Sequence, residues 1–187
     1  MAQECSEEQL KEFRRRLETE RPAPWESLPD IPLYMDQVVA YLGRQLITFD
    51  GREALTSAMI NNYIKDGLVP RTSGKKYERE HLAYLTMVAA VKQVLSVRDM
   101  RSLLQTVDKP IEPQEVYELF RADLDLALQE TLKNMADFPE QEDLSALALS
   151  LAVRSYASAL ACRRIVDLLR PEEDKKKKKH KEEEAAP

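Results

Sequence analysis

The stretch SAMINNYIKDGLVPRTSGKKYEREHLAYL, residues 57–85, decides the fold. Its first part repeats apolar positions at helical spacing, and Thr56 or Ser57 can cap the N-terminus of that helix. Gly-Leu-Val-Pro at 67–70 ends the helix, because glycine adopts positive φ at a helix C-terminus and proline cannot continue a helix. The turn-rich segment 68–77 then predicts a two-stranded β-hairpin before the next helix.

Further helices are predicted on both sides of this stretch, so the fold class is mainly α. Only four glycines occur in 187 residues, of which 43% are hydrophobic, a composition that favours helices over strands. A proline-rich linker after the first helix carries the single tryptophan, Trp25, which we expect to pack on the following domain. The other predicted helices span 6–20, 33–46, 79–95, 96–105, 116–138 and 142–169.

These elements predict four units along the chain: an N-terminal helix and linker (1–28), a helical head with the hairpin (29–108), a C-terminal helical region (109–170) and a charged tail (171–187). The tail holds six lysines and six acids without an apolar anchor, so we expect it to be disordered. The segment 142–169 is rich in alanine and serine, which predicts a helix packed closely between others or paired with a copy of itself.

Charge is unevenly distributed along the chain. The formal net charge is -5, yet residues 52–101 hold nine Lys or Arg and five acids, so the rest of the chain carries a net charge of about -9. A basic head on an acidic body confines attraction for phosphate to one surface.

The two cysteines are far apart in sequence, which predicts free thiols in a reducing cytoplasm. The charged N-terminus lacks the apolar core of a signal peptide, and the helix at 142–169 carries Arg154 near its centre, so we expect neither secretion nor a membrane span.

Motifs for catalysis and cofactor binding are missing from the sequence. Two histidines, no Cys-x-x-Cys and few glycines argue against a zinc site and a phosphate-binding glycine loop. We therefore predict a protein that is not an enzyme and needs no metal or cofactor. The sequence carries no signature of a small-molecule effector.

The central third of the chain resembles the MerR-type winged helix-turn-helix head. The recognition helix of that family ends in a tyrosine followed by Gly-Leu-hydrophobic-Pro, a basic wing that closes with Tyr, and two further helices. The matching positions are Tyr63, Gly67, Leu68, Val69, Pro70, Gly74, Lys75, Lys76, Tyr77, His81, Leu82, Ser96, Val97 and Met100. Where the family usually has Arg-Tyr, this chain has Asn61-Asn62, and asparagine can pair with adenine edges.

Together with LPDIPLYMDQVVAYL at 28–42, the arrangement also resembles a family of uncharacterised bacterial cytosolic proteins known only as a domain of unknown function. The MerR-type resemblance implies a DNA-binding transcriptional regulator that dimerises through its C-terminal helices. It would place one helix in the major groove and a basic wing on phosphates. The residues expected to contact DNA are Ser57, Asn61, Asn62, Lys65, Arg71, Lys75, Lys76, Arg79 and His81.

Two alternatives remain at the level of sequence. His81 is either a phosphate contact at a helix N-terminus or a boundary residue of the fold. The whole protein is either a regulator or a non-enzymatic helical protein-interaction module that keeps the winged fold as a scaffold, because basic residues on a turn also occur on ordinary solvated surfaces.

Overall fold

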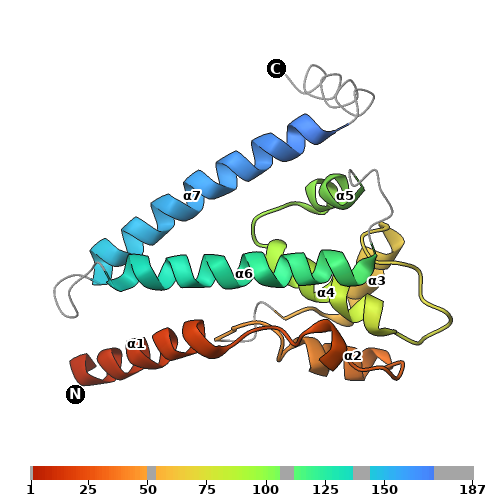
Figure 1. Cartoon of the computed structure of the whole chain (residues 1–187), viewed down its shortest axis with the longest axis horizontal. Coiled ribbons are helices and arrows are strands. Elements are labelled where there is room, and N and C mark those ends of the chain that lie inside the picture. The colour runs from red at the N-terminus through yellow and green to blue at the C-terminus, as the bar shows by residue number, and fades with distance from the viewer. Residues whose placement is uncertain (1, 50–53, 106–111, 137–143, 171–187) are drawn as a thin grey trace.

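The computed structural model describes residues 2–49, 54–105, 112–136 and 144–170. Over these ranges it contains seven α-helices, one short 3-10 helix and no β-strand, which confirms the mainly helical class (Figure 1). The elements are α1 (Ala2–Thr19), η1 (Trp25–Ser27), α2 (Met35–Leu42), α3 (Ser57–Lys65), α4 (Arg79–Val91), α5 (Val97–Gln105), α6 (Pro113–Ala136) and α7 (Leu144–Leu169). The tail predicted to be disordered, 171–187, lies outside the described residues.

Helices α2 to α5 form a compact head around one hydrophobic core. Val38, Ile60, Leu82 and Leu85, from α2, α3 and α4, are fully buried in it. Helix α2 is shorter than predicted. After Leu42 the chain continues in i to i+3 turns, in which backbone N–H groups donate to carbonyls three residues back rather than four.

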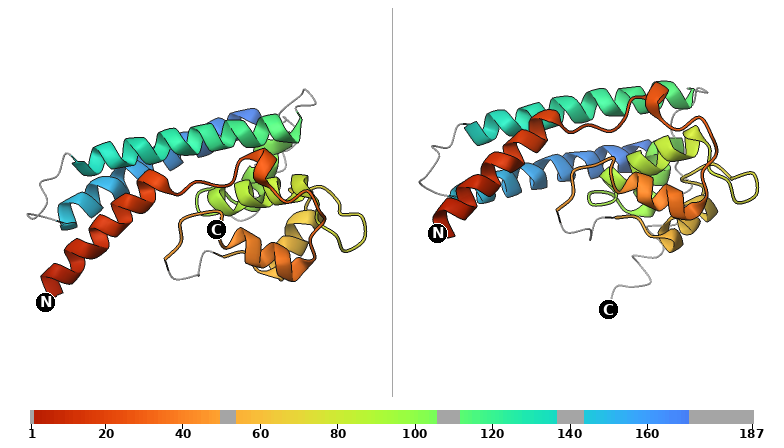
Figure 2. Two further views of the ribbon diagram at one scale, coloured as in Figure 1. Left: turned by 60° about the horizontal axis from the view of Figure 1, so that its bottom comes forward. Right: turned by 90° about the horizontal axis from the view of Figure 1, so that it is seen from below.

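The long helices α1, α6 and α7 extend from the head, with α6 lying between α7 and α1 in Figure 1, where α7 diverges from α6 toward its C-terminal end. Figure 2 shows the same helices from two further directions. Leu17 of α1, Met135 of α6 and Leu147 of α7 are buried together where these helices meet. This small second core holds the extension together away from the head.

The linker between α1 and α2 packs across both parts. Trp25 contacts Tyr117 of α6 at 6.3 Å between ring centroids, and the Arg79 guanidinium lies 5.9 Å from the Trp25 ring centroid. The Tyr117 hydroxyl donates to the Ala23 carbonyl at 2.9 Å. The predicted anchor role of Trp25 is thus confirmed.

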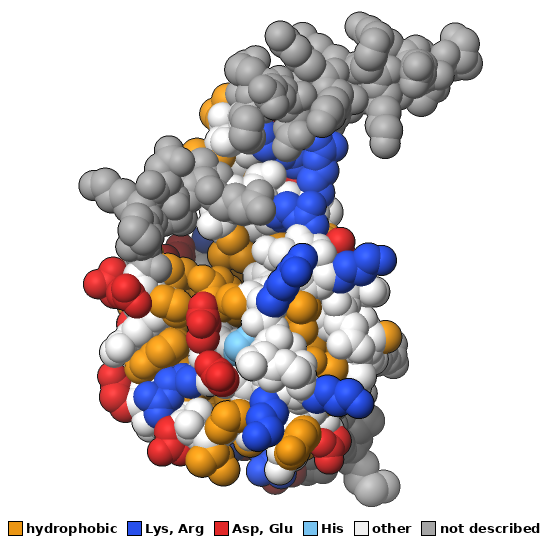
Figure 3. All heavy atoms as spheres, turned by 90° about the vertical axis from the view of Figure 1, so that its right-hand side faces the viewer, with side chains coloured by type: hydrophobic (Ala, Val, Ile, Leu, Met, Phe, Trp, Pro, Cys, Tyr) orange, Lys and Arg blue, Asp and Glu red, His pale blue; other side chains and the backbone are white. Residues whose placement is uncertain are grey.

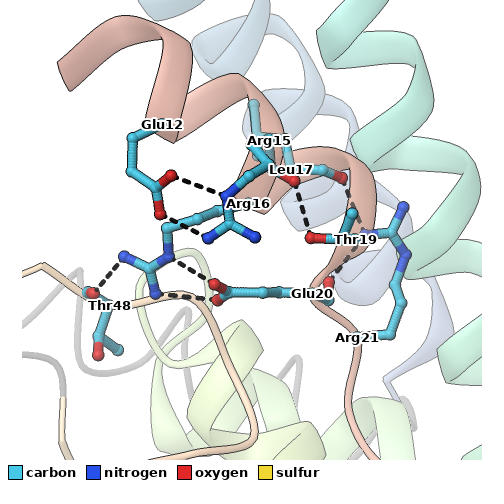
Figure 4. A network of polar contacts seen from close by, with 8 residues as sticks. All are labelled: Glu12, Arg15, Arg16, Leu17, Thr19, Glu20, Arg21 and Thr48. Carbon is cyan, nitrogen blue, oxygen red and sulfur yellow. Dashed lines mark hydrogen bonds and ion pairs between the residues drawn. The ribbon is translucent and has the colours of Figure 1, made fainter. Parts of the chain in front are cut away.

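The end of α1 is fixed by a polar network (Figure 4). The Arg16 guanidinium donates to both carboxylate oxygens of Glu20, at 2.8 and 2.9 Å, and to the Thr48 carbonyl at 3.1 Å. Its hydrogen bonds hold the pKa of Glu20 below the usual value for a glutamate. The network ties α1 to the chain that leaves α2.

Helix α7 is packed only near its two ends. Leu147 is buried against α1 and α6, while Val166 joins the core of the head. At the C-terminal end, the buried Arg170 pairs with Asp99 of α5 and with Asp167. The alternative in which α7 is sandwiched between other helices of the chain is therefore wrong for the described residues, since the middle of the helix has no helix on its outer side.

Candidate nucleic-acid interface

Helix α3 forms because its sequence combines a good cap with an amphipathic pattern. The Thr56 hydroxyl accepts a hydrogen bond from the Met59 N–H at 3.3 Å, which fixes the N-terminus as predicted. Ile60 and Tyr63 point into the core of the head. Gly67 has a φ of 71°, the left-handed conformation expected after the helix.

The opposite face of α3 is polar and open to solvent. Ser57, Asn61 and Lys65 follow one another at intervals of four residues, so their side chains align along the helix, with Asn62 beside them. All four are exposed. The structure thus brings together the four residues of α3 that the sequence assigned to DNA contact.

The segment after α3 is a tight turn, and the predicted β-hairpin wing is wrong. Only an isolated bridge joins Ser73 to Lys76, with Gly74 at a φ of 71°. The main chain of Tyr77 pairs instead with Leu33, through N–H to carbonyl bonds of 2.8 and 2.9 Å. No strand continues from either bridge among the described residues, so the turn carries no wing.

One cation of the turn at 70–77, Lys75, lies close to the polar face of α3. Arg71, Lys75 and Lys76 are all exposed. Lys75 lines a hollow of about 610 Å³ together with Ser57 and Asn61. Hydrogen-bonding groups of α3 and the positive charge of Lys75 therefore share one hollow. Figure 3 shows the side of the molecule that lies at the right in Figure 1, where Lys and Arg side chains lie among uncharged and acidic ones.

The hollow also contains residues that the sequence reasoning missed. Tyr34 and Asp36, at the start of α2, lie on its rim and are exposed. A carboxylate repels phosphate but accepts a hydrogen bond from the amino group of cytosine. The pairing of Leu33 with Tyr77 places these residues there, and no local sequence signal reveals that pairing.

His81 and Arg79 do not share this surface. His81 is 4% exposed; its Nδ1 accepts from the Glu78 N–H at 3.1 Å, which leaves Nε2 to donate to the Arg71 carbonyl at 3.5 Å. The phosphate contact predicted for His81 is thus replaced by a structural role in which its ring joins α4 to the turn. Arg79 is half-buried and stacks over Trp25.

Two tyrosines support the surface from beneath. Tyr63 and Tyr77 are buried, and burial raises the pKa of both phenols, so they remain uncharged near neutral pH. No cluster of three metal-binding side chains occurs among the residues that the structure describes. The chemistry that this surface offers is hydrogen bonding, the positive charge of the turn and the negative charge of Asp36.

Residues 23–120, just over half of the chain, match a protein family described as Domain of unknown function (DUF1836). Neither the curated proteins nor the solved structures include a significant match to the chain. The family match covers the linker, the head and the start of α6, and it lends no support to the MerR-type resemblance.

Proposed function

This chain belongs to the DUF1836 family, whose description names no activity, and we propose that it is a DNA-binding transcriptional regulator. In this proposal α2 and α3 act as a helix-turn-helix similar to that of MerR-type proteins, with α3 in the major groove. The observation that carries the proposal is the hollow that Ser57 and Asn61 of α3 share with Lys75 of the turn at 70–77, a turn that also exposes Arg71 and Lys76. The proposal involves no catalytic step and no cofactor, and it places the protein in the cytoplasm.

Base recognition is assigned to α3. Asn61 and Asn62 present amide groups of the kind that pair with adenine through its N6 and N7 atoms. Ser57 and Lys65 lie one turn of helix on either side of Asn61, so the polar face is two turns long. A face of this length reaches a few base pairs in one groove.

Phosphate contact is assigned to the turn. Arg71, Lys75 and Lys76 are exposed, and exposed cations beside a recognition helix fix its orientation on the DNA backbone. Arg79 and His81 are left out because the first faces Trp25 and the second is buried. One head thus offers few phosphate contacts, so useful affinity requires two heads on one DNA site.

A second candidate function is a helical protein-interaction module in which the head is only a scaffold. The observation that favours it is the exposed apolar face of α7, which no described part of the chain covers. The two functions differ in what the head does: a regulator loses affinity for DNA when the turn loses its charge, whereas an interaction module has no such affinity to lose.

The test measures the affinity of the full chain for labelled genomic fragments by fluorescence anisotropy at increasing salt concentrations. The triple variant Arg71→Ala, Lys75→Ala and Lys76→Ala should bind many sequences more weakly, with a log–log salt slope less steep by roughly 2 to 3 per head. The matched control removes the same charge from exposed sites on α1, α6 and α7, through Lys11→Ala, Lys133→Ala and Arg164→Ala, and should retain most of the affinity. The regulator function fails if wild type shows no salt-sensitive binding at low ionic strength.

A further inference from the structure

The outer side of α7 carries a continuous apolar stripe. Leu149, Val153, Tyr156 and Leu160 are 66%, 58%, 68% and 56% exposed, respectively. Their spacing of four, three and four residues aligns them along one line of the helix. We call these four side chains the outer stripe. Leu147 and Leu151, which contact the rest of the chain, lie about half a turn away, and the buried Val166 lies about a third of a turn away.

We propose that the outer stripe binds the outer stripe of a second copy of this chain, with the two α7 helices antiparallel. The spacing of four, three and four residues is symmetric about the point between Arg154 and Ser155. An antiparallel pair with that centre therefore places Leu149 opposite Leu160 of the second copy, and Val153 opposite Tyr156. Such self-complementarity is what a two-fold symmetric interface requires.

The residues beside the outer stripe suit close approach and carry little charge. Ala148, Ala152, Ala157 and Ala161 border it, are exposed, and allow two helix backbones to come near each other. Arg154 is the only charged residue between 149 and 160, and the helical repeat turns it well away from the seam. Two copies of the same helix thus meet without opposing like charges.

The area of the stripe sets the expected strength of the pair. The four large side chains with their bordering alanines remove on the order of 500 Å² per chain from water, or about 1,000 Å² in total, which is near the lower limit for a specific interface. We therefore expect a dimer that dissociates in the micromolar range rather than an obligate one.

The alternative occupant of this apolar face is a lipid bilayer. By length and composition alone, α7 is the one helix among the described residues that could cross a membrane. A span would have to break the buried pair of Arg170 with Asp99 and remove Val166 from the core of the head. Arg154 would lie near the middle of the bilayer, where a charged side chain is unfavourable. These contacts favour a second copy of the chain over a lipid bilayer as the occupant of the outer stripe.

The pairing also sets the distance between two heads, a step that rests on the proposed function. Each head joins α7 at Val166, which lies about 17 Å along the helix from the centre of the pair. The two junctions are therefore about 35 Å apart, close to one turn of B-DNA at about 34–36 Å. We expect a DNA site with two half-sites related by a two-fold axis.

Sedimentation equilibrium of the full chain tests the pairing without DNA. Wild type should approach twice the 21.5 kDa chain mass as concentration rises. Leu149→Glu with Leu160→Glu should weaken the dimer by roughly 100-fold, because the antiparallel register faces glutamate with glutamate at both positions. Leu149→Lys with Leu160→Glu should dimerise at least about 10-fold more tightly than the double-glutamate variant, because the same register faces lysine with glutamate.

The matched control is Leu144→Glu with Ile165→Glu, two exposed side chains on the far side of the same helix, and it should leave the dimer intact. Circular dichroism checks that each variant keeps its helices. A wild-type mass of 21.5 kDa at every concentration overturns the proposal, as does equal dissociation of the two Leu149/Leu160 variants. Flotation of wild type with phosphatidylcholine vesicles, lost in the double-glutamate variant, overturns it in favour of a membrane. Loss of DNA binding with an intact dimer counts against the proposed function alone.

Discussion

Helices α3 and α7 both present one face to solvent, yet the two faces are chemically opposite. The open face of α3 consists of Ser57, Asn61, Asn62 and Lys65, whereas that of α7 is the apolar outer stripe. Water forms hydrogen bonds with the polar face of α3, whereas contact between water and the apolar outer stripe of α7 is unfavourable. The exposed polar face of α3 therefore does not by itself indicate a binding partner. The exposed apolar outer stripe of α7 does indicate one.

The roles proposed for the two surfaces depend on different physical effects. The DNA function assigned to α3 rests on arrangement, namely Ser57 and Asn61 of the helix beside Lys75 of the turn. The pairing assigned to α7 rests on the free energy of apolar burial, together with a spacing that fits an antiparallel copy. Substitutions on the buried and exposed sides of α3 and α7 test this difference between the two helices.

The largest expected effect comes from the buried side of α3. Ile60→Ala should lower the free energy of unfolding by about 2–5 kcal/mol, because Ile60 is fully buried and its loss leaves a cavity in the head. Guanidinium unfolding followed by circular dichroism measures the change. A loss below about 1 kcal/mol would mean that α3 is not held by this core.

The next effect tests how α7 is fixed to the head. Asp99→Ala should cost about 1–3 kcal/mol, because it leaves the buried Arg170 guanidinium with only Asp167 and removes the side chain that bonds to Ser96. Hydrogen exchange should become faster at the C-terminal end of α7. The double variant Asp99→Ala with Arg170→Met should regain part of the loss, and a double variant less stable than the single one would contradict the pairing.

A smaller effect is expected at the cap of α3. Thr56→Ala should cost about 1 kcal/mol, since the Met59 N–H loses its side-chain acceptor, and Thr56→Ser should restore most of it. Thermal unfolding of the two variants measures the difference. Equal melting temperatures for Thr56→Ala and wild type would show that the cap does not determine where α3 begins.

The smallest effect on folding is expected on the open face of α3. Asn61→Ala and Asn62→Ala should each change the free energy of unfolding by less than about 0.5 kcal/mol, because neither side chain is packed. The same variants should reduce discrimination between DNA sequences by about 1–3 kcal/mol. Competition binding with matched and mismatched fragments separates the two quantities. Strong destabilisation by either variant would indicate a structural role for this face instead.

The sequence predicts α3 well because its signals are local. The Thr56 cap, the buried Ile60 and Tyr63, and the positive φ of Gly67 all follow from residues within one short segment. The signals at the start of α5 are equally local, since the Ser96 hydroxyl donates to the Asp99 carboxylate and accepts from the Asp99 N–H.

The errors arise where distant residues compete. The predicted hairpin is reduced to the isolated Ser73–Lys76 bridge, while the main chain of Tyr77 pairs with Leu33, more than forty residues away in sequence. His81 is buried because its ring meets the carbonyl of Arg71, a contact that helical periodicity does not reveal. The middle of α7 is exposed because α1 and α6 contact it only near its N-terminal end and the head only near its C-terminal end. Its small and apolar residues alone do not indicate on which side a neighbour lies.

The most direct test of the DNA-binding function is the enrichment of random DNA on the purified full chain, followed by sequencing. We predict a motif of two half-sites related by a two-fold axis, with centres about 10–10.5 base pairs apart. The Arg71→Ala, Lys75→Ala and Lys76→Ala variant should retain less DNA of every sequence, whereas Asn61→Ala and Asn62→Ala should change the motif. Recovery of no sequence above the starting pool, or of the same motif at the same yield with all of these variants, would contradict the DNA-binding function.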